Sequence, residues 1–259
     1  MNYNFELPHI PDRSVKPRNA GLTMVMDKGL STRQAEDFVS VNANFVDFVK
    51  LGFGTSMLSN NIDEKIKLYK ENNIRTYLGG TLFEAFIVRN KFNAYLKLMD
   101  KLKLDMAEVS DGSVEMPHDK KCEYINTLSK YVTVLSEVGS KEEGIIIHPS
   151  KWISMMKKEL DAGSFKVIAE ARESGNVGIF HRNGSAHTLL INKITSKIKQ
   201  EDIIWETPQK QQQVYFIKLM GANVNVGNIS YDDVIPLETL RIGLRGDTFF
   251  NFLPDNLKA

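Results

Sequence analysis

Carboxylates that end short apolar runs are the residues of this sequence best suited to chemistry. They are Asp27, Glu108, Glu137, Glu170 and Glu206. A carboxylate inside a buried strand is costly unless it is paired or bound to a cation. Oxygen ligands without His or Cys suit a hard ion such as Mg²⁺. The pattern therefore predicts a Mg²⁺ site. As its ligands we take Glu108, Glu137 and Glu170, directly or through water, with Asp27 as a weaker candidate.

Cations accompany these carboxylates. Lys50, Lys141 and Arg172 each stand close to the end of a predicted strand. Positive side chains among carboxylates at the strand ends predict an anionic substrate. The alternative is that the two kinds of charge form only a structural network of ion pairs. Because nearly every predicted strand ends in a charge or an amide, we favour a functional site.

Other kinds of site find little support in the sequence. The five histidines lack the spacing of a metal site, and no GxSxG or Walker motif is present. The single cysteine, Cys122, excludes a disulfide framework. A net charge of +1 argues against a nucleic-acid partner. We interpret the scattered lysines, and the glutamines of 211–213, as solvated surface.

A chain with one cysteine is typical of the reducing cytosol. The N-terminal segment has no signal-like apolar region, and no run approaches a membrane span of about 20 residues. We therefore expect a cytoplasmic location and no membrane contact.

Short apolar runs alternate with longer amphipathic runs along all 259 residues. The strand-like runs are Leu22–Asp27, Phe45–Lys50, Ile74–Gly79, Met106–Ser110, Val132–Glu137, Lys166–Glu170, Ile203–Glu206 and Asn223–Val226. Eight strand–helix units without a linker predict a single (β/α)8 TIM barrel over residues 1–259, with residues 1–20 as an N-terminal extension. The alternative is a doubly wound open sheet, but no GxGxxG motif follows the first run. In a barrel the strand ends meet at one mouth, where active sites lie.

Nine segments, in order along the chain, resemble the phosphosulfolactate synthase family. They are Lys16–Leu30, Asp47–Ser56, Gly79–Glu84, Ala107–Ser113, Glu137–Lys141, Asp161–Gly175, Glu206–Gln213, Asn223–Ile229 and Leu237–Phe249. Two positions depart from the family pattern: Ser140 precedes Lys141 where members often carry two lysines, and Glu206–Pro208 reads ETP rather than EAP.

The resemblance implies a (β/α)8 barrel that adds sulfite to phosphoenolpyruvate with Mg²⁺, giving (2R)-phospho-3-sulfolactate. In archaeal members this reaction is the first step of coenzyme M synthesis. The sequence does not decide between that pathway and another sulfonate pathway for this chain. The resemblance further implies a homo-oligomer, with a trimer as one candidate. The family includes a plant heat-stress protein of less certain activity. Two alternatives therefore remain: a different Mg²⁺-dependent phosphoenolpyruvate enzyme, and a non-catalytic stress-associated protein on the same barrel.

The implied reaction gives the cations separate tasks. Mg²⁺ on the phosphoenolpyruvate carboxylate would withdraw charge and let sulfite attack the methylene carbon. A general acid must then protonate the carbon that carries the phosphate, and Lys141 is our first candidate, with Lys50 competing. Arg172 can bind a carboxylate or sulfite through its guanidinium fork.

A phosphate in a barrel is commonly held after the last two strands. Gly227 and Asn228 fit that position, in front of a helix expected to begin near Asp232. Arg245 has two possible places: at the mouth on the phosphate if the last helix is short, or at the opposite end near Asp247 and Arg18 if it is long.

Overall fold

Eight parallel strands form the centre of the computed structural model, which describes residues 3–139 and 147–258. The strands are β1 (Thr23–Asp27), β2 (Phe48–Leu51), β3 (Arg75–Leu78), β4 (Met106–Val109), β5 (Thr133–Val138), β6 (Lys166–Ala169), β7 (Ile203–Glu206) and β8 (Val226–Ile229). Their order is β3-β2-β1-β8-β7-β6-β5-β4. The outermost strands, β3 and β4, lie side by side, so the sheet curves into a nearly closed barrel. The predicted (β/α)8 barrel is confirmed.

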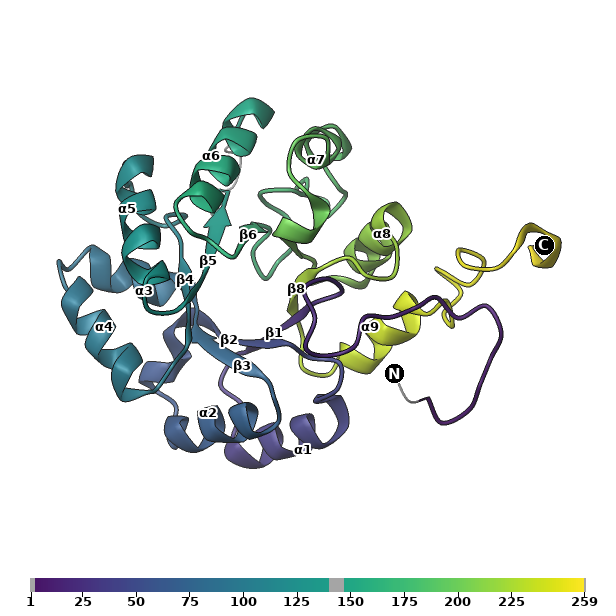
Figure 1. Cartoon of the computed structure of the whole chain (residues 1–259), viewed down its shortest axis with the longest axis horizontal. Coiled ribbons are helices and arrows are strands. Elements are labelled where there is room, and N and C mark those ends of the chain that lie inside the picture. Colours follow the sequence, from purple (N-terminus) through teal and green to yellow (C-terminus); the bar gives the residue numbers. More distant parts are fainter. Residues whose placement is uncertain (1–2, 140–146, 259) are drawn as a thin grey trace.

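Helices surround the strands, as Figure 1 shows. They are α1 (Thr32–Asn42), α2 (Ile62–Glu71), α3 (Gly80–Ile87), α4 (Phe92–Lys101), α5 (His118–Ser129), α6 (Pro149–Asp161), α7 (Thr188–Thr195), α8 (Lys210–Met220) and α9 (Val234–Arg241), with 3₁₀ turns at Gly52–Met57, Gln200–Asp202 and Asp255–Leu257. Ser31 begins α1 with a capping box, because its side chain accepts from Gln34 N and Gln34 reciprocates. Each helix packs an apolar side on the barrel.

Two element boundaries differ from the sequence-based expectation. The amphipathic run from Phe83 to Leu104 predicts one helix but forms two, and Asn90 between them has a left-handed backbone with φ 54°. The last strand begins at Val226 rather than Asn223, and the side chains of Asn223 and Asn225 bind neighbouring segments. As a result Gly227 and Asn228 lie inside β8, not in the loop after it.

The interior of the barrel is filled by one apolar layer at its amino-terminal half. Its members are Leu22, Met24, Phe48, Tyr77, Met106, Leu135, Ile168 and Ile204, all at most 4% exposed. Side chains alternate between the two faces of a strand, so the residue two positions after each member also points inward. This period places the next interior layer at the carboxyl ends of the strands.

An ion pair holds the N-terminal segment on the barrel. The Arg13 guanidinium binds the Glu238 carboxylate on α9 at 2.9 and 3.0 Å, and also donates to the carbonyl of Ala222. In Figure 1 the segment before Arg13 and the segment after α9 both extend away from the barrel on the same side. Among the described residues, no helix is long and apolar enough to cross a membrane.

The Arg13–Glu238 pair gives a stability prediction. Both side chains are buried, at 0% and 6% exposure, so Arg13→Met should lower the free energy of unfolding by about 3 kcal/mol. Lys258→Met is the control, because Lys258 pairs with the almost fully exposed Asp255 and its loss should have no measurable effect. Urea denaturation checks both, and equal losses would contradict the anchoring role of Arg13.

Candidate active site

Five charged side chains form the inner layer at the carboxyl end of the barrel, which we call the mouth. Lys50, Glu108, Glu137, Glu170 and Glu206 each stand two residues after a member of the apolar layer, and each is at most 6% exposed. The strand period therefore points all five inward. The prediction that Glu108, Glu137, Glu170 and Glu206 converge at one mouth is confirmed.

Lys50 lies among three of these carboxylates. Its Nζ is 3.1 Å from Glu108 Oε1, 3.3 Å from Glu137 Oε2 and 3.3 Å from Glu206 Oε1. Burial alone would lower the pKa of Lys50, but the surrounding carboxylates raise it well above its usual range. Lys50 is therefore a strong ion-pair partner and, while these carboxylates are ionised, a weak acid.

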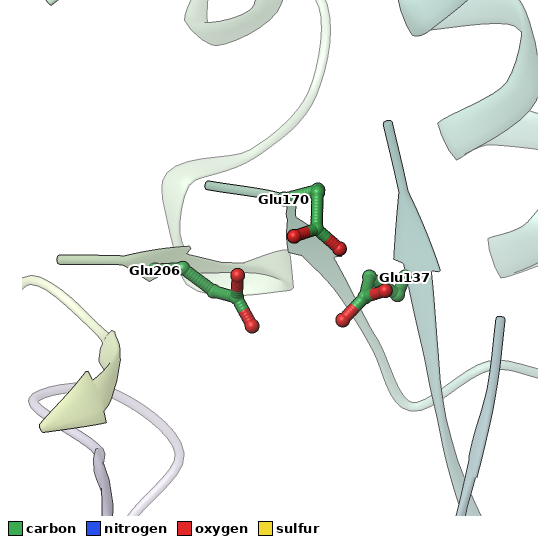
Figure 2. A group of neighbouring side chains, drawn as sticks. All are labelled: Glu137, Glu170 and Glu206. Atoms are coloured by element: carbon green, nitrogen blue, oxygen red, sulfur yellow. The ribbon is translucent and has the colours of Figure 1, made fainter. Parts of the chain in front are cut away.

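Glu137, Glu170 and Glu206 form a group that could hold a metal ion. One oxygen from each lies within 4.8 Å of the other two. Figure 2 shows their carboxylates turned toward a common space from β5, the end of β6, and β7. Glu170 is oriented by the backbone N–H of Arg172, which donates to its Oε1 at 2.7 Å.

The buried charge changes the acidity of Glu206. Burial, together with the charges of Glu137 and Glu108, raises the pKa of Glu206 to about 7, although Lys50 and the N–H of Ala171 act in the opposite direction. Without a metal ion this carboxyl therefore holds a proton over much of the range below neutral pH.

Two of the four predicted metal ligands lie outside this group. Asp27 follows Met26, an inward-facing residue, so its side chain points outward to α2, where Lys65 Nζ lies at 2.6 Å and the Tyr69 hydroxyl at 3.0 Å. Glu108 is inside the barrel but interacts with Lys50 and with the backbone N–H of Gly80, which donates to its Oε1 at 2.6 Å.

Glu206 is the group member that the sequence-based ligand set omitted. It was recognised as a strand-end carboxylate but not as a ligand. The signal was available, because Glu206 follows Ile204 by the same two-residue step that separates Glu137 from Leu135.

Other predicted site residues line or adjoin a cavity of about 420 Å³ above these carboxylates. The exposed Arg172 and the buried Asn228 are part of its wall. The Oδ1 of Asn228 has no hydrogen-bond partner within the described part of the chain. Gly227 instead faces the apolar layer, since a Cβ there would lie 2.5 Å from Met24 Cε.

Arg245 lies on the mouth side of the barrel but outside that cavity. Because α9 has only eight residues, the chain turns back, and Asp247 binds Lys210 at the start of α8 at 2.6 Å. Arg245 borders a separate hollow of about 380 Å³ with Pro236 and Thr239 on α9. Arg18 is at the opposite end, paired with Asp47 at 2.9 Å.

Lys141 and Ser140 lie outside the described residues, so the structure does not place the first candidate for the general acid. The prediction that the lysines lie on a solvated surface is wrong for Lys65 and Lys121, each 1% exposed. It is also wrong for Gln212 and Gln213, which bind loop carbonyls.

A larger hollow, of about 1070 Å³, opens at the amino-terminal end of the barrel. Its cations are already engaged: Lys16 donates to the carbonyls of Ala43 and Val46, Arg18 binds Asp47, and Arg75 binds Asp105. In spite of its size, we place the candidate site at the mouth, where buried carboxylates converge.

Comparison with known proteins relates the chain to one enzyme family. A family model described as (2R)-phospho-3-sulfolactate synthase (ComA) matches residues 11–247. The phosphosulfolactate synthase of Methanothermobacter thermautotrophicus is 40% identical over 244 residues, covering 92% of this chain and 95% of that protein. The phosphosulfolactate synthase of Bacillus subtilis is 38% identical over 244 residues, covering 93% and 97%.

Solved structures share the fold at low identity. 3-Hexulose-6-phosphate synthase from Salmonella typhimurium aligns with a TM-score of 0.54 at 12% identity, covering 84% of this chain and 98% of that one. Thiamine phosphate pyrophosphorylase from Pyrococcus furiosus aligns with a TM-score of 0.53 at 9% identity, covering 90% and 96%. These likenesses support the barrel alone.

The raised pKa of Glu206 predicts a pH dependence of stability in metal-free protein. In the unfolded chain the pKa of this carboxyl is its ordinary value of 4.5, and in the folded chain it is about 7. Between these values only the folded protein keeps the proton, so its free energy of unfolding should fall as pH rises from about 5 through 7, by up to about 1.4 kcal/mol per pKa unit. Glu206→Gln should reduce this slope. Urea denaturation in chelator at several pH values measures it, and identical slopes would contradict the assignment.

Proposed function

The chain belongs to the (2R)-phospho-3-sulfolactate synthase family and is a phosphosulfolactate-forming enzyme, and from this we propose that it adds sulfite to phosphoenolpyruvate at the mouth of the barrel. We further propose that Mg²⁺ assists the reaction and is held by Glu137, Glu170 and Glu206. The observation that carries the proposal is the convergence of these three buried carboxylates.

Charge balance supports a divalent cation at this position. Four carboxylates share the inner layer with one buried ammonium, that of Lys50. When all are ionised the layer is strongly negative, which is costly in a buried site unless a cation binds there. An all-oxygen donor set suits Mg²⁺, which usually takes only part of its ligands from the protein and leaves positions for substrate and water.

The side chains around the cavity supply complementary interactions for an anionic substrate. Bound Mg²⁺ would supply positive charge that offsets the charge developing on the substrate carboxylate. Lys50 keeps Glu137 and Glu206 in fixed positions through its ion pairs. The Arg172 guanidinium can bind sulfite or carboxylate oxygens at the rim. Asn228 Oδ1 can accept a hydrogen bond from a ligand hydroxyl or an ordered water.

The general acid remains assigned to Lys141, with Lys50 as the alternative. The raised pKa of Lys50 disfavours it as an acid near neutral pH. The phosphate is assigned to the wall that contains Asn228, next to Gly227. The position of Arg245 outside the cavity argues against a direct contact with phosphate in this conformation.

We also propose the organisation and setting of the enzyme. Residues 1–259 form one barrel domain with residues 1–20 as an extension, and the enzyme acts in the cytoplasm on small molecules. It is a homo-oligomer, with a trimer as one candidate. Exposed aromatic side chains on both terminal segments, including Phe5 and Phe250, support contact with another copy.

The metal role of Glu170 is the direct test of this proposal. Product formation from phosphoenolpyruvate and sulfite, followed by mass spectrometry, should require Mg²⁺ and stop in chelator. Glu170→Gln should raise the Mg²⁺ concentration for half-maximal activity and lower turnover by tenfold or more, because one anionic ligand is lost. Glu36→Gln, on the exposed side of α1, is the control. Full activity of the parent enzyme without metal would remove the carboxylates from the ligand role.

The role of Lys141 is tested separately. If Lys141 protonates the substrate carbon, Lys141→Ala should still bind phosphoenolpyruvate but lose about 10²–10⁴-fold in turnover. Lys141→Arg should not restore activity, because guanidinium stays protonated. Steady-state kinetics separate the two effects, and near-parental turnover of Lys141→Ala would transfer the role to Lys50.

A further inference from the structure

A buried lysine on α5 joins three segments at the mouth. Lys121 is 1% exposed. Its Nζ lies 2.9 Å from Glu159 Oε1 on α6, 2.8 Å from Asp111 Oδ1 in the loop after β4, and 2.5 Å from the backbone carbonyl oxygen of Glu137 on β5. Burial would lower the pKa of Lys121, but Glu159 and Asp111 raise it above its usual range, so it stays charged.

The carbonyl of Glu137, to which Lys121 donates, lies beyond the pairing of β4 with β5. β4 and β5 pair only as far as Val109 and Ser136. The N–H of Thr133 donates to the carbonyl of Asp105, on the β4 side of β5. The backbone groups of every second residue in a strand point to the same side, so those of Glu137 also point toward β4. The Glu137 carbonyl therefore points to a side where β4 has already ended, and a buried carbonyl without a donor is costly.

We propose that Lys121 is a positioning residue for the metal site: by holding the backbone of Glu137, it fixes the direction in which the Glu137 carboxylate enters the barrel. This inference rests on the proposed function, since it assigns a support to one of the three proposed ligands. The same ammonium holds Asp111, which lies two residues before Ser113 in the cavity wall. Lys121 thus sets the distance between the end of β5 and the loop after β4.

The charges around Lys121 indicate that it is tightly held. Glu159 is completely buried, and burial raises its pKa although the charge of Lys121 acts in the opposite direction. His118 Nδ1 lies 3.7 Å from Glu159 Oε1, and burial together with the charge of Lys121 lowers the pKa of this histidine. A neutral His118 leaves Lys121 as the cation that pairs with Glu159.

Lys65 provides a matched comparison within the same chain. It is also 1% exposed and also extends from a helix, α2, to the end of a strand, where it binds Asp27 at 2.6 Å. Asp27 points away from the barrel interior and lies outside the group of three carboxylates. Loss of either lysine leaves buried carboxylate unpaired, but only Lys121 contacts a proposed ligand residue.

The experiment compares Lys121→Met with Lys65→Met in the full chain. Thermal unfolding measures stability, calorimetric titration measures Mg²⁺ affinity, and steady-state assays with sulfite and phosphoenolpyruvate give kcat and the Mg²⁺ concentration for half-maximal activity. We expect both variants to lose stability. Only Lys121→Met should weaken Mg²⁺ binding, by about 10–100-fold, the usual effect of removing a group that orients a metal ligand.

The outcomes separate this inference from the proposed function. Equal Mg²⁺ affinity in Lys121→Met and the parent protein, or an equal loss in Lys65→Met, overturns the positioning role. If the parent protein neither binds nor requires Mg²⁺, the metal proposal fails and the positioning role fails with it. Mg²⁺-dependent turnover of the parent with unchanged Mg²⁺ affinity in Lys121→Met overturns the positioning role alone. If Lys121→Met does not fold, Asp111→Asn and Glu159→Gln replace it, because each removes one charge that holds the lysine. Both variants should weaken Mg²⁺ binding, and parental Mg²⁺ affinity in both overturns the positioning role.

Discussion

Four carboxylates and one ammonium share the inner layer at the mouth of the barrel, and the cost of burying this charge constrains the structure around them. Lys50 contacts Glu108, Glu137 and Glu206 within 3.3 Å, while Glu137, Glu170 and Glu206 bring oxygens within 4.8 Å of one another. A barrel kept only for its stability would be better served by apolar residues in this layer. The arrangement is understandable if the charge is used, first to bind a cation and then to act on an anionic substrate.

Buried polar groups on the helices hold the mouth from outside. Glu84 on α3 accepts from the hydroxyl of Ser110 and the N–H of Ser113, and Gln212 on α8 donates to the carbonyl of Gly175 at 2.7 Å. Lys65 and Lys121 do the same for the ends of β1 and β5. Loops that would otherwise move are thereby fixed relative to the strands, which a site with preorganised charge requires. The apolar layer beneath and these polar contacts around the mouth act together on the same carboxylates.

The sequence was sufficient to predict the barrel and the convergence of its glutamates, because the strand runs are short, apolar and regularly spaced. It was not sufficient to orient each residue, since a shift of one position moves a side chain to the other face of a strand. Asp27 directly follows an inward-facing residue, Met26, and therefore points outward, whereas Glu170 follows Ile168 by two and points inward. Lys121 was taken for a surface residue because its three acceptors come from distant segments, which no local pattern reveals. The left-handed turn at Asn90, which divides α3 from α4, had no signal in the apolar spacing either.

Glu137, Glu170 and Glu206 together are proposed to bind a divalent cation. Anomalous X-ray scattering from crystals soaked in Mn²⁺, as a substitute for Mg²⁺, locates such an ion directly. One strong peak is expected at coordination distance from a carboxylate oxygen of each of the three glutamates, and Glu170→Gln should weaken it. The absence of a peak at the mouth at saturating Mn²⁺, or a peak at Asp27 instead, would contradict this metal site.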